Sequence, residues 1–441
     1  MNSLKTLPLI IKPFTKPVIK KINVPGSKSL TNRLFPLAIL SEKPVIITGS
    51  LESEDAKIMR DALVKMGAKI TEIKTELDKN FVSDWKIETA DFFTNTDDIE
   101  LFCGNSGTSV RFLTALCALR KGKTTLTGTH RMLVRPIGDL CDALQEIGVN
   151  IEYNKNKNFP PHTIFPSKFF TQKQKTVHLS GKLSSQFFTA LFHIAPKIGL
   201  EIIVDNELVS KPYINMTIEV MKDFGIEIEN VENQYKIFTI KQQEFFASNI
   251  VSVEGDASSA TYPLAIGLIT GGNVEIGNLP KNSLQGDAKF KELVIDKMKN
   301  SEFISKEKTP NINPLIPLGN IDLEDIPDAA LTAIALCGYA DGYTKITGLS
   351  TLRHKECDRL FAMETNLRKM GIEVKTGNDY IEIWGNSKKI HGAEIECFDD
   401  HRIAMSFAVL GTVVENVKIL DPDCTKKTFP SFWKDLEKWR V

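Results

Sequence analysis

Several short stretches of this sequence bring lysine, arginine and hydroxyl side chains together. The first is residues 25–33, PGSKSLTNR, between two apolar runs. Ser27 and Ser29 belong to the residue types that cap helix N-termini. Lys28 and Arg33 add cations where the helix dipole is already positive, which favours a phosphate or carboxylate ligand. An ordinary capped helix with two basic residues is the alternative.

The first half of the chain continues this pattern with hydroxyl, amide and guanidinium groups. The candidate residues here are Asn105, Gly107, Arg135, Ser184, Ser185, Gln186, Ser210 and Tyr213. Hydroxyl and guanidinium groups suit phosphate and carboxylate oxygens, and arginine binds such oxygens in a bidentate manner. We therefore expect an anion-binding surface in this half.

The second half combines acids with bases. Its candidates are Asp328, Lys355, Glu356, Arg359, His401, Arg402 and Lys427. Asp328 precedes an apolar helix pattern, so a helix N-cap is its alternative role. Lys355 and Arg359 are four residues apart and would share one face of a helix, which could also be an ordinary exposed charged helix.

One α/β pattern recurs roughly every 70–80 residues. Each copy has a polar opening, an apolar helix pattern, a short β-type run and an amphipathic helix pattern that ends near a glycine. The apolar helices are expected at 29–40, 106–119, 184–195, 256–269, 327–339 and 400–411. Amphipathic helix patterns that no such glycine ends cover 287–298 and 432–440, the latter as the last helix.

Six small units cannot each hold a core, so we expect an α/β protein of two similar domains with three units each. The N-terminal-half domain is predicted at 23–253. The other domain combines 1–22 with 254–441, because the first opening motif follows the first strand so closely. A solenoid of six stacked repeats is the alternative.

Composition and charge narrow the class of protein. Lys+Arg and Asp+Glu both number 55, so the formal net charge is zero and broad adhesion to nucleic acid or anionic membrane is not expected. The seven cysteines are scattered without a CxxC pair, which indicates a cytosolic protein with reduced thiols and without a zinc site. We expect a cytoplasmic protein that has no membrane span and no metal.

The motifs resemble those of the EPSP synthase family. They are PGSKSLTNR (25–33), GNSGTSVR (104–111), RPIG (135–138), LSSQF (183–187), LVSKPYI (208–214), EGDASSA (254–260), IPDAA (326–330), LRHKECDR (352–359), DDHRIAM (399–405) and KTFP (427–430), in the family order. The resemblance implies transfer of the enolpyruvyl group of phosphoenolpyruvate to the 5-hydroxyl of shikimate 3-phosphate, through a tetrahedral intermediate. The products are 5-enolpyruvylshikimate 3-phosphate and phosphate, in chorismate and aromatic amino-acid biosynthesis.

The resemblance also implies an architecture and a way of working. Each domain would comprise three βαβαββ units in an inside-out α/β barrel, and the two domains would close over a central cleft. No metal or organic cofactor is implied. The expected partners are the two small-molecule substrates, rather than nucleic acid or membrane, and the expected state is a monomer.

Roles carry over from the family motifs residue by residue. The resemblance assigns shikimate 3-phosphate to Lys28, Ser29, Arg33, Ser184, Ser185, Gln186, Ser210, Tyr213, Asp328, Thr351 and Lys355. It assigns phosphoenolpyruvate to Lys28, Asn105, Gly107, Arg135, Gln186, Arg359, His401, Arg402 and Lys427. Asp328 would be the base for the 5-hydroxyl, Glu356 would transfer a proton at the methylene carbon, and Lys28 would touch both substrates.

Two departures from the family pattern and two alternatives stand beside this interpretation. Thr351 replaces the usual asparagine, and Phe112 replaces a common proline near the site of the competing herbicide glyphosate. Gly107 leaves room for the herbicide, so we expect a sensitive enzyme. The alternatives are the related enolpyruvyltransferase that acts on UDP-N-acetylglucosamine, and a repeat-built protein that binds anions without catalysis.

Overall fold

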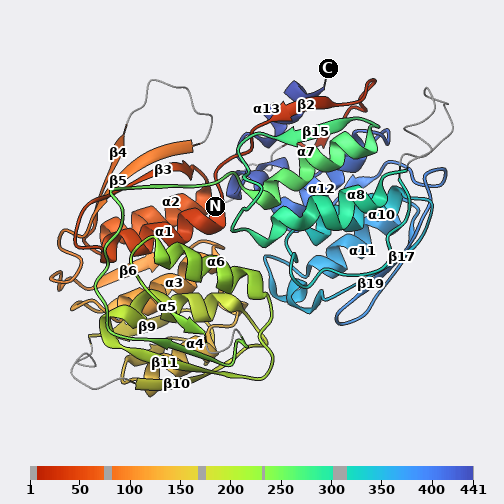
Figure 1. Cartoon of the computed structure of the whole chain (residues 1–441). Coiled ribbons are helices and arrows are strands. Elements are labelled where there is room, and N and C mark those ends of the chain that lie inside the picture. The colour runs from red at the N-terminus through yellow and green to blue at the C-terminus, as the bar shows by residue number, and fades with distance from the viewer. Residues whose placement is uncertain (1–6, 74–81, 167–174, 231–233, 301–314, 441) are drawn as a thin grey trace. The chain divides into compact units, whose positions relative to one another are not determined.

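The computed structural model describes residues 7–73, 82–166, 175–230, 234–300 and 315–440. The chain forms two compact units, which are the two bodies of Figure 1. The N-terminal unit is the uninterrupted segment Gly26–Glu254, and the C-terminal unit combines Met1–Pro25 with Gly255–Val441. The chain therefore passes between the units twice, after Pro25 and after Glu254.

Two four-stranded sheets of the N-terminal unit share one topology, with the strands in the orders β6-β7-β9-β8 and β10-β11-β13-β12. In each sheet the first two strands are parallel and the other neighbours antiparallel. One repeat is β6 (Ile99–Phe102), α3 (Gly107–Cys117), β7 (Thr124–Thr127), α4 (Gly138–Glu146), β8 (Asn150–Tyr153) and β9 (His162–Phe165). The next is β10 (Lys175–Ser180), α5 (Ser185–Ile198), β11 (Leu200–Asp205), α6 (Lys211–Lys222), β12 (Glu229–Asn230) and β13 (Ile237–Ile240).

The third sheet of the N-terminal unit takes its first strand from the far end of the segment. Its order is β14-β3-β5-β4, and β14 is parallel to β3. The elements are α1 (Lys28–Leu40), β3 (Val45–Leu51), α2 (Glu54–Lys65), β4 (Lys69–Ile73), β5 (Val82–Glu88) and β14 (Ile250–Ser252). This sheet repeats the topology of the other two, although the strand that precedes the first helix in the repeat comes last in sequence.

The C-terminal unit contains one sheet of the same kind, in the order β16-β17-β19-β18. Its elements are β16 (Gly319–Asp322), α10 (Ala330–Tyr339), β17 (Gly342–Thr347), η6 (Ser350–His354), α11 (Arg359–Lys369), β18 (Glu373–Thr376) and β19 (Ile381–Gly385). Two smaller sheets are β15-β2 and β1-β21-β20. Their strands are β1 (Leu9–Ile10), β2 (Ile19–Ile22), β15 (Asn273–Ile276), β20 (Glu394–Ile395) and β21 (Lys418–Ile419). The helices of this part of the unit are α7 (Ala257–Ile269) and α12 (His401–Gly411).

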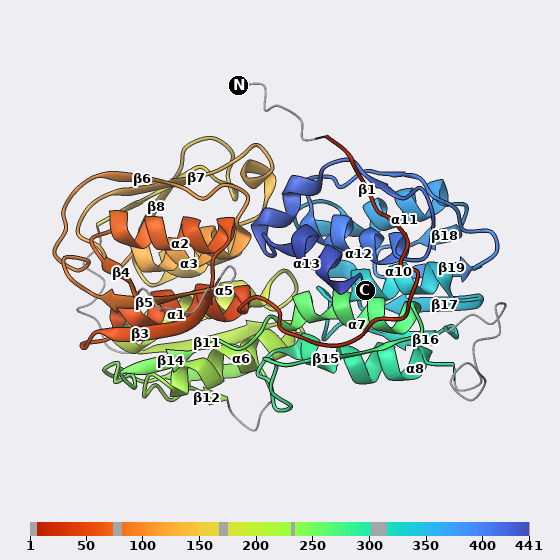
Figure 2. The same ribbon diagram turned by 90° about the horizontal axis from the view of Figure 1, so that it is seen from above.

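Each unit contains one strand that, in the sequence, directly precedes the first helix of the other unit. β2 precedes α1 in the chain but pairs in parallel with β15 of the C-terminal unit, and Figure 2 shows this red segment running beside α7 and β15. β14 precedes α7 but pairs with β3 of the N-terminal unit. The two units therefore exchange strands where the chain passes between them.

The six apolar helices are confirmed within a few residues of their predicted bounds. They are α1, α3, α5, α7, α10 and α12, and almost every residue of each is buried. A side-chain oxygen caps five of them, from Ser27, Ser106, Ser184, Asp256 and Asp400. A helix that is apolar nearly all round is stable only when its neighbours cover it, which explains why these helices form the cores.

The amphipathic helix patterns are confirmed where a glycine ends them. Gly67, Gly148, Gly225 and Gly371 all have positive φ, and each lets the chain reverse after a helix. The helix predicted at 287–298 is confirmed in place, but its turns are irregular. A 3-10 turn, η4 (Gly286–Lys289), a π turn, η5 (Lys291–Ile295), and an α turn, α8 (Asp296–Met298), follow one another without a break. The last helix is α13 (Phe432–Trp439). Across the described residues, no helix is both long and apolar enough to cross a membrane.

Candidate active site

Asp328 of the C-terminal unit lies immediately before α10 but does not cap it. The N-cap position is Ala329, and no side chain caps this helix. The Asp328 carboxylate instead accepts hydrogen bonds from Arg359 Nη1 at 2.8 Å and from Arg402 Nη2 at 2.9 Å. The N-cap alternative for Asp328 is therefore wrong, and its carboxylate belongs to a buried cluster of charges.

Arg359 is the centre of that cluster. Its side chain is 1% exposed and contacts three carboxylates, with Nε 2.8 Å from Asp400 Oδ2 and Nη2 2.9 Å from Glu356 Oε2, besides the bond to Asp328. Burial lowers the pKa of Arg359, but Asp400, Glu356 and Asp328 together raise the pKa well above its ordinary value. Arg359 therefore stays charged and holds two candidate proton-transfer groups, Asp328 and Glu356, in place.

Lys355 also contacts this cluster, but it lies outside the helix that contains Arg359. Its Nζ lies 3.7 Å from Asp328 Oδ1. The prediction that Lys355 and Arg359 share a helix face is wrong, because Asp358 caps α11 and the helix begins only at Arg359. Lys355 follows η6 in an extended conformation, and from there it reaches the carboxylate that Arg359 also binds.

Arg402 and His401 open α12, which Asp400 caps through a bond from the Arg402 backbone N–H at 2.9 Å. Arg402 is 4% exposed, and its Nε has no partner among the described residues. Burial lowers the pKa of Arg402, but the carboxylate of Asp328 raises it above its ordinary value. His401 is fully buried, with Nδ1 3.7 Å from Asp400 Oδ1. Lys427 is buried at the end of η7 (Pro422–Lys427).

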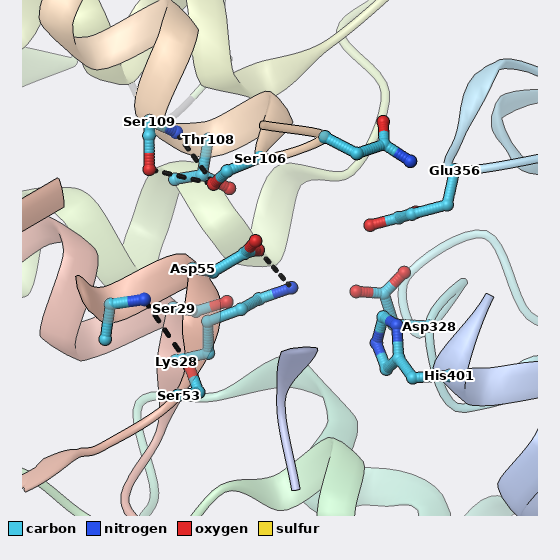
Figure 3. A network of polar contacts seen from close by, with 12 residues as sticks. Lys28, Ser29, Ser53, Asp55, Ser106, Thr108, Ser109, Asp328, Glu356 and His401 are labelled. Atoms are coloured by element: carbon cyan, nitrogen blue, oxygen red, sulfur yellow. Dashed lines mark hydrogen bonds and ion pairs between the residues drawn. The ribbon is translucent and has the colours of Figure 1, made fainter. Parts of the chain in front are cut away.

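The N-terminal unit places Lys28 as the first residue of α1. Its Nζ lies 3.9 Å from Asp55 Oδ2, and Figure 3 shows the two side chains pointing toward each other. Asp55 belongs to the first turn of α2 and its side chain is only 3% exposed. The predicted cation is thus held beside a carboxylate that the sequence interpretation did not include.

Arg33, one turn further along α1, is bound within its own unit. Its Nε donates to Thr217 Oγ1 at 2.9 Å, and its Nη1 donates to the Ser29 backbone oxygen at 2.9 Å. The guanidinium also lies over the rings of Phe112 and Tyr213, at 5.6 and 5.9 Å. Burial lowers the pKa of Arg33 to about 10. The backbone of Ser29, which precedes it by four residues, thus helps to fix this side chain.

Gln186 and Ser184 at the start of α5 are joined to α3 by an arginine that the site prediction omitted. Arg111 Nη1 donates to Gln186 Oε1 at 2.6 Å and to Ser184 Oγ at 3.4 Å. Gln186 Nε2 in turn donates to Thr108 Oγ1 at 3.1 Å. The amide of Gln186 is therefore oriented at both ends, and Ser184 also caps α5.

Gly107 and Arg135 lie against each other at the start of α3. A Cβ atom on Gly107 would be 2.2 Å from Arg135 Nη2, which is far inside van der Waals contact. Arg135 Nη1 donates to the backbone and side-chain oxygens of Asn105, at 3.0 and 3.3 Å. Glycine at 107 is thus required for the position that the Arg135 guanidinium occupies.

The other predicted residues occupy element starts. Ser185 begins α5, and Ser210 precedes α6 with a φ of +56°. Tyr213 lies in the first turn of α6, where its backbone oxygen accepts from Arg33 Nη2 at 3.4 Å. Thr351 lies in η6 of the C-terminal unit, and its Oγ1 is buried without a hydrogen-bond partner among the described residues.

The predicted residues thus form two sets, one in each unit. The structure adds Asp55, Arg111 and Asp400, which hold members of these sets. Arg111 and Asp400 stand inside quoted motifs, GNSGTSVR and DDHRIAM, so sequence reasoning could have included them as partners of the charged residues. Within the described ranges, no group of three or more His, Cys, Asp or Glu residues is arranged to hold a metal ion.

The chain was compared with known proteins. Residues 14–436 match the sequence model of EPSP synthase (3-phosphoshikimate 1-carboxyvinyltransferase). The 3-phosphoshikimate 1-carboxyvinyltransferase of Buchnera aphidicola subsp. Cinara cedri is 40% identical, with 94% of each chain covered. That of Shewanella sp. (strain W3-18-1) is 41% identical, with 96% of this chain and 97% of the relative covered.

A solved structure agrees on the fold. The EPSP synthase of Acinetobacter baumannii superposes with a TM-score of 0.73 at 24% identity, with 99% of this chain and 98% of that chain covered. The family match and the relatives cover nearly the whole chain, including every motif quoted above. The chain belongs to the EPSP synthase (3-phosphoshikimate 1-carboxyvinyltransferase) family.

Proposed function

We propose that this protein transfers the enolpyruvyl group of phosphoenolpyruvate to the 5-hydroxyl of shikimate 3-phosphate and releases phosphate. The observation that carries the proposal is the buried cluster of Arg359, Asp328 and Arg402 inside a family match over residues 14–436. Fixed guanidinium groups stabilise an anionic substrate, and the carboxylate between them provides a proton acceptor. UDP-N-acetylglucosamine enolpyruvyl transfer is not favoured by the comparisons.

The residues of the N-terminal unit are proposed to bind shikimate 3-phosphate. Ser184, Ser185 and Ser210 offer hydroxyl groups, and Gln186 offers an amide that Arg111 orients. Arg33 is bonded to its own unit, so we assign it mainly to holding Ser29 and Tyr213 in position. In the C-terminal unit, Lys355 and Thr351 are proposed to contact the same substrate.

Phosphoenolpyruvate is proposed to bind the cations. Arg135 is held beside Gly107 by Asn105. Arg402 Nε has no hydrogen-bond partner in the part of the chain that the structure describes, so this N–H can donate to a ligand. Arg359, His401, Lys427, Lys28 and Gln186 complete the proposed set. An anion that binds Arg359 and Arg402 competes with Asp328 for the same N–H donors.

That competition suggests how Asp328 becomes a base. A carboxylate held by two guanidinium groups is a poor proton acceptor. Once the substrate anion takes over part of this bonding, the proton affinity of Asp328 rises and it accepts the proton of the 5-hydroxyl. Glu356 delivers a proton to the methylene carbon while the 5-oxygen bonds to the adjacent carbon. The Glu356 carboxylate then takes back a proton from the new methyl group as the C–O bond to phosphate breaks, and the double bond is restored.

The proposal also covers the arrangement of the repeats within each unit. Four sheets of identical strand order support the βαβαββ repeat. We propose that the repeats of each unit form an inside-out α/β barrel, that the units close over the substrates, and that the enzyme acts as a cytoplasmic monomer. In this scheme Lys28 contacts both substrates.

One assay tests the proposed function. The protein is incubated with shikimate 3-phosphate and phosphoenolpyruvate, and phosphate and 5-enolpyruvylshikimate 3-phosphate are measured by colorimetry and NMR. We expect one phosphate for each enolpyruvyl group transferred. Absence of both products, or phosphate release that is equally fast with UDP-N-acetylglucosamine as acceptor, would contradict the proposal.

A further inference from the structure

Asp287 is a buried carboxyl group of the C-terminal unit that the proposed mechanism does not use. It lies in η4, and the residue is 4% exposed. One oxygen, Oδ2, accepts a hydrogen bond from Ser258 Oγ in the first turn of α7. The other oxygen, Oδ1, is buried and has no hydrogen-bond partner among the described residues. A buried carboxylate with an unsatisfied oxygen is unfavourable unless nearby charge or a proton compensates it.

The groups that face Asp287 come from three other elements. Asp328 precedes α10, Arg402 opens α12, and Asp256 caps α7. Burial, and after it the charges of Asp328 and Asp256, raise the pKa of Asp287 to about 7, while Arg402 and the Ser258 hydroxyl act in the opposite direction. Near neutral pH the group is therefore divided between its neutral and charged forms.

The ion pairs of the cluster do not include Asp287. Arg359, Arg402 and Lys355 contact the carboxyl groups of Asp328, Glu356 and Asp400. An ionised Asp287 adds a negative charge near Arg402, and among the described residues its Oδ1 has no hydrogen-bond partner. An incoming substrate anion adds more negative charge at the same place.

We infer that Asp287 is a positioning residue for Arg402: its carboxyl group binds a proton when the anionic part of phosphoenolpyruvate reaches this guanidinium. The inference rests on the proposed function. In its neutral form Asp287 leaves the full charge of Arg402 to the substrate. In its ionised form Asp287 repels the substrate anion and neutralises part of the positive charge of Arg402.

The direction of the pH effect follows from this arrangement. An anion near Asp287 favours the protonated form, so binding takes up protons at pH 7–8. As pH rises, Asp287 loses its proton and the affinity for phosphoenolpyruvate falls. KM for phosphoenolpyruvate should therefore increase by up to tenfold per pH unit. This dependence is added to any that comes from the ionisation of the substrate itself.

The test compares the wild-type chain with Asp287→Asn, which keeps the shape of the side chain but cannot ionise. KM for phosphoenolpyruvate is measured from pH 6.5 to 9, and we expect the variant to lose most of the alkaline rise. Ser258→Ala removes the hydroxyl that favours the ionised form, so its rise should begin at higher pH. A merely structural role for Asp287 would change KM equally at all pH values, and that result would overturn the inference.

A binding measurement without turnover separates this inference from the proposed function. Glyphosate, which the family resemblance predicts to compete with phosphoenolpyruvate, is titrated into the protein with saturating shikimate 3-phosphate, at pH 7.5 in buffers of different ionisation enthalpy. Proton uptake should be smaller for Asp287→Asn than for the wild type by a fraction of a proton per site. The ionisation of glyphosate cancels in this difference.

Each outcome has one meaning. Absence of glyphosate binding together with absence of turnover would contradict the proposed function. Binding with equal proton uptake in wild type and Asp287→Asn would overturn only the role of Asp287. Asp84→Asn, which alters a buried carboxylate of the N-terminal unit that bonds the Gly49 backbone, is the control and should leave the uptake unchanged. If Asp287→Asn fails to fold, an unshifted pH profile of Ser258→Ala overturns the inference.

Discussion

Arg359 Nη1 and Asp328 Oδ1 form a hydrogen-bonded ion pair at 2.8 Å between the start of α11 and the residue that precedes α10. No side chain caps α10, whereas Asp358 caps α11, and the first residue of α11 turns its guanidinium toward three carboxylates. The side chain that could have capped α10 is used to hold a charged group. Breaking this pair should therefore affect chemistry more than helix stability.

Asp328→Asn tests that distinction. Asparagine keeps the size of the side chain but removes the charge that Arg359 and Arg402 bind, and it cannot accept the proton of the 5-hydroxyl. We expect kcat to fall by about 10²–10⁴, measured as phosphate release. Asp322→Asn, at an exposed residue of β16 in the same unit, should keep wild-type activity. Activity of Asp328→Asn within a few fold of wild type would show that Asp328 is not the base.

Glu356→Gln tests the second carboxylate. Its Oε2 lies 2.9 Å from Arg359 Nη2, and glutamine can keep this contact through its carbonyl oxygen while losing the transferable proton. We expect kcat to fall by about 10²–10⁴ with little change in either KM. Exchange of deuterium from solvent into the methylene group of phosphoenolpyruvate, measured by NMR, should fall in parallel. Unchanged exchange would assign this proton to another group.

Gly107→Ala tests the close approach to Arg135. The added Cβ would lie 2.2 Å from Arg135 Nη2, so the guanidinium must move. We expect KM for phosphoenolpyruvate to rise about tenfold, which corresponds to about 1.4 kcal/mol, while KM for shikimate 3-phosphate stays within about twofold. Steady-state kinetics with each substrate varied in turn measures both. An equal increase in both values would contradict the assignment of Arg135 to phosphoenolpyruvate.

His193→Leu concerns stability rather than activity. His193 in α5 is fully buried with neither ring nitrogen hydrogen-bonded among the described residues, and burial together with the charge of Arg33 lowers its pKa to about 3. The unfolded chain protonates this histidine near pH 6.5 while the folded chain does not, so acid destabilises the fold. The leucine variant should lose this effect, which is worth about 2 kcal/mol at pH 5 relative to pH 7.5.

Urea unfolding at the two pH values measures this difference. His178→Gln, at an exposed histidine of β10, is the matched control and should keep the wild-type dependence on pH. An unchanged acid dependence in His193→Leu would mean that His193 becomes protonated in the folded protein.

Local patterns predicted much of the fold. The apolar helices and the glycines after the amphipathic helices follow from burial and from the left-handed turn, which depend on neighbouring residues alone. The pattern at 287–298 predicted a helix, but it did not reveal the 3-10 and π turns of that stretch or the hydrogen bond between Ser258 of α7 and Asp287. A contact between distant segments is not visible in a local pattern.

Local patterns also predicted only part of the candidate site. Motifs located Lys28, Arg359 and Arg402, since charged residues at helix starts are visible in the sequence. The partners of these residues were not visible. Asp328 was open to interpretation as an N-cap, and Lys355 was assigned to a helix that begins only after it. Which carboxylate meets which cation depends on the packing of α10, α11 and α12.

The exchange of strands has a consequence for the order in which the chain can fold during synthesis. The N-terminal unit is one continuous segment, so all its residues have been made once the ribosome passes Glu254. β2, made near the beginning, must wait for β15, and Val24 bonds the side chain of Asn278, which is 254 residues away. During that interval Ile22, buried in the finished protein, has no strand to pair with. β2 is therefore a segment that chaperones could bind while translation continues.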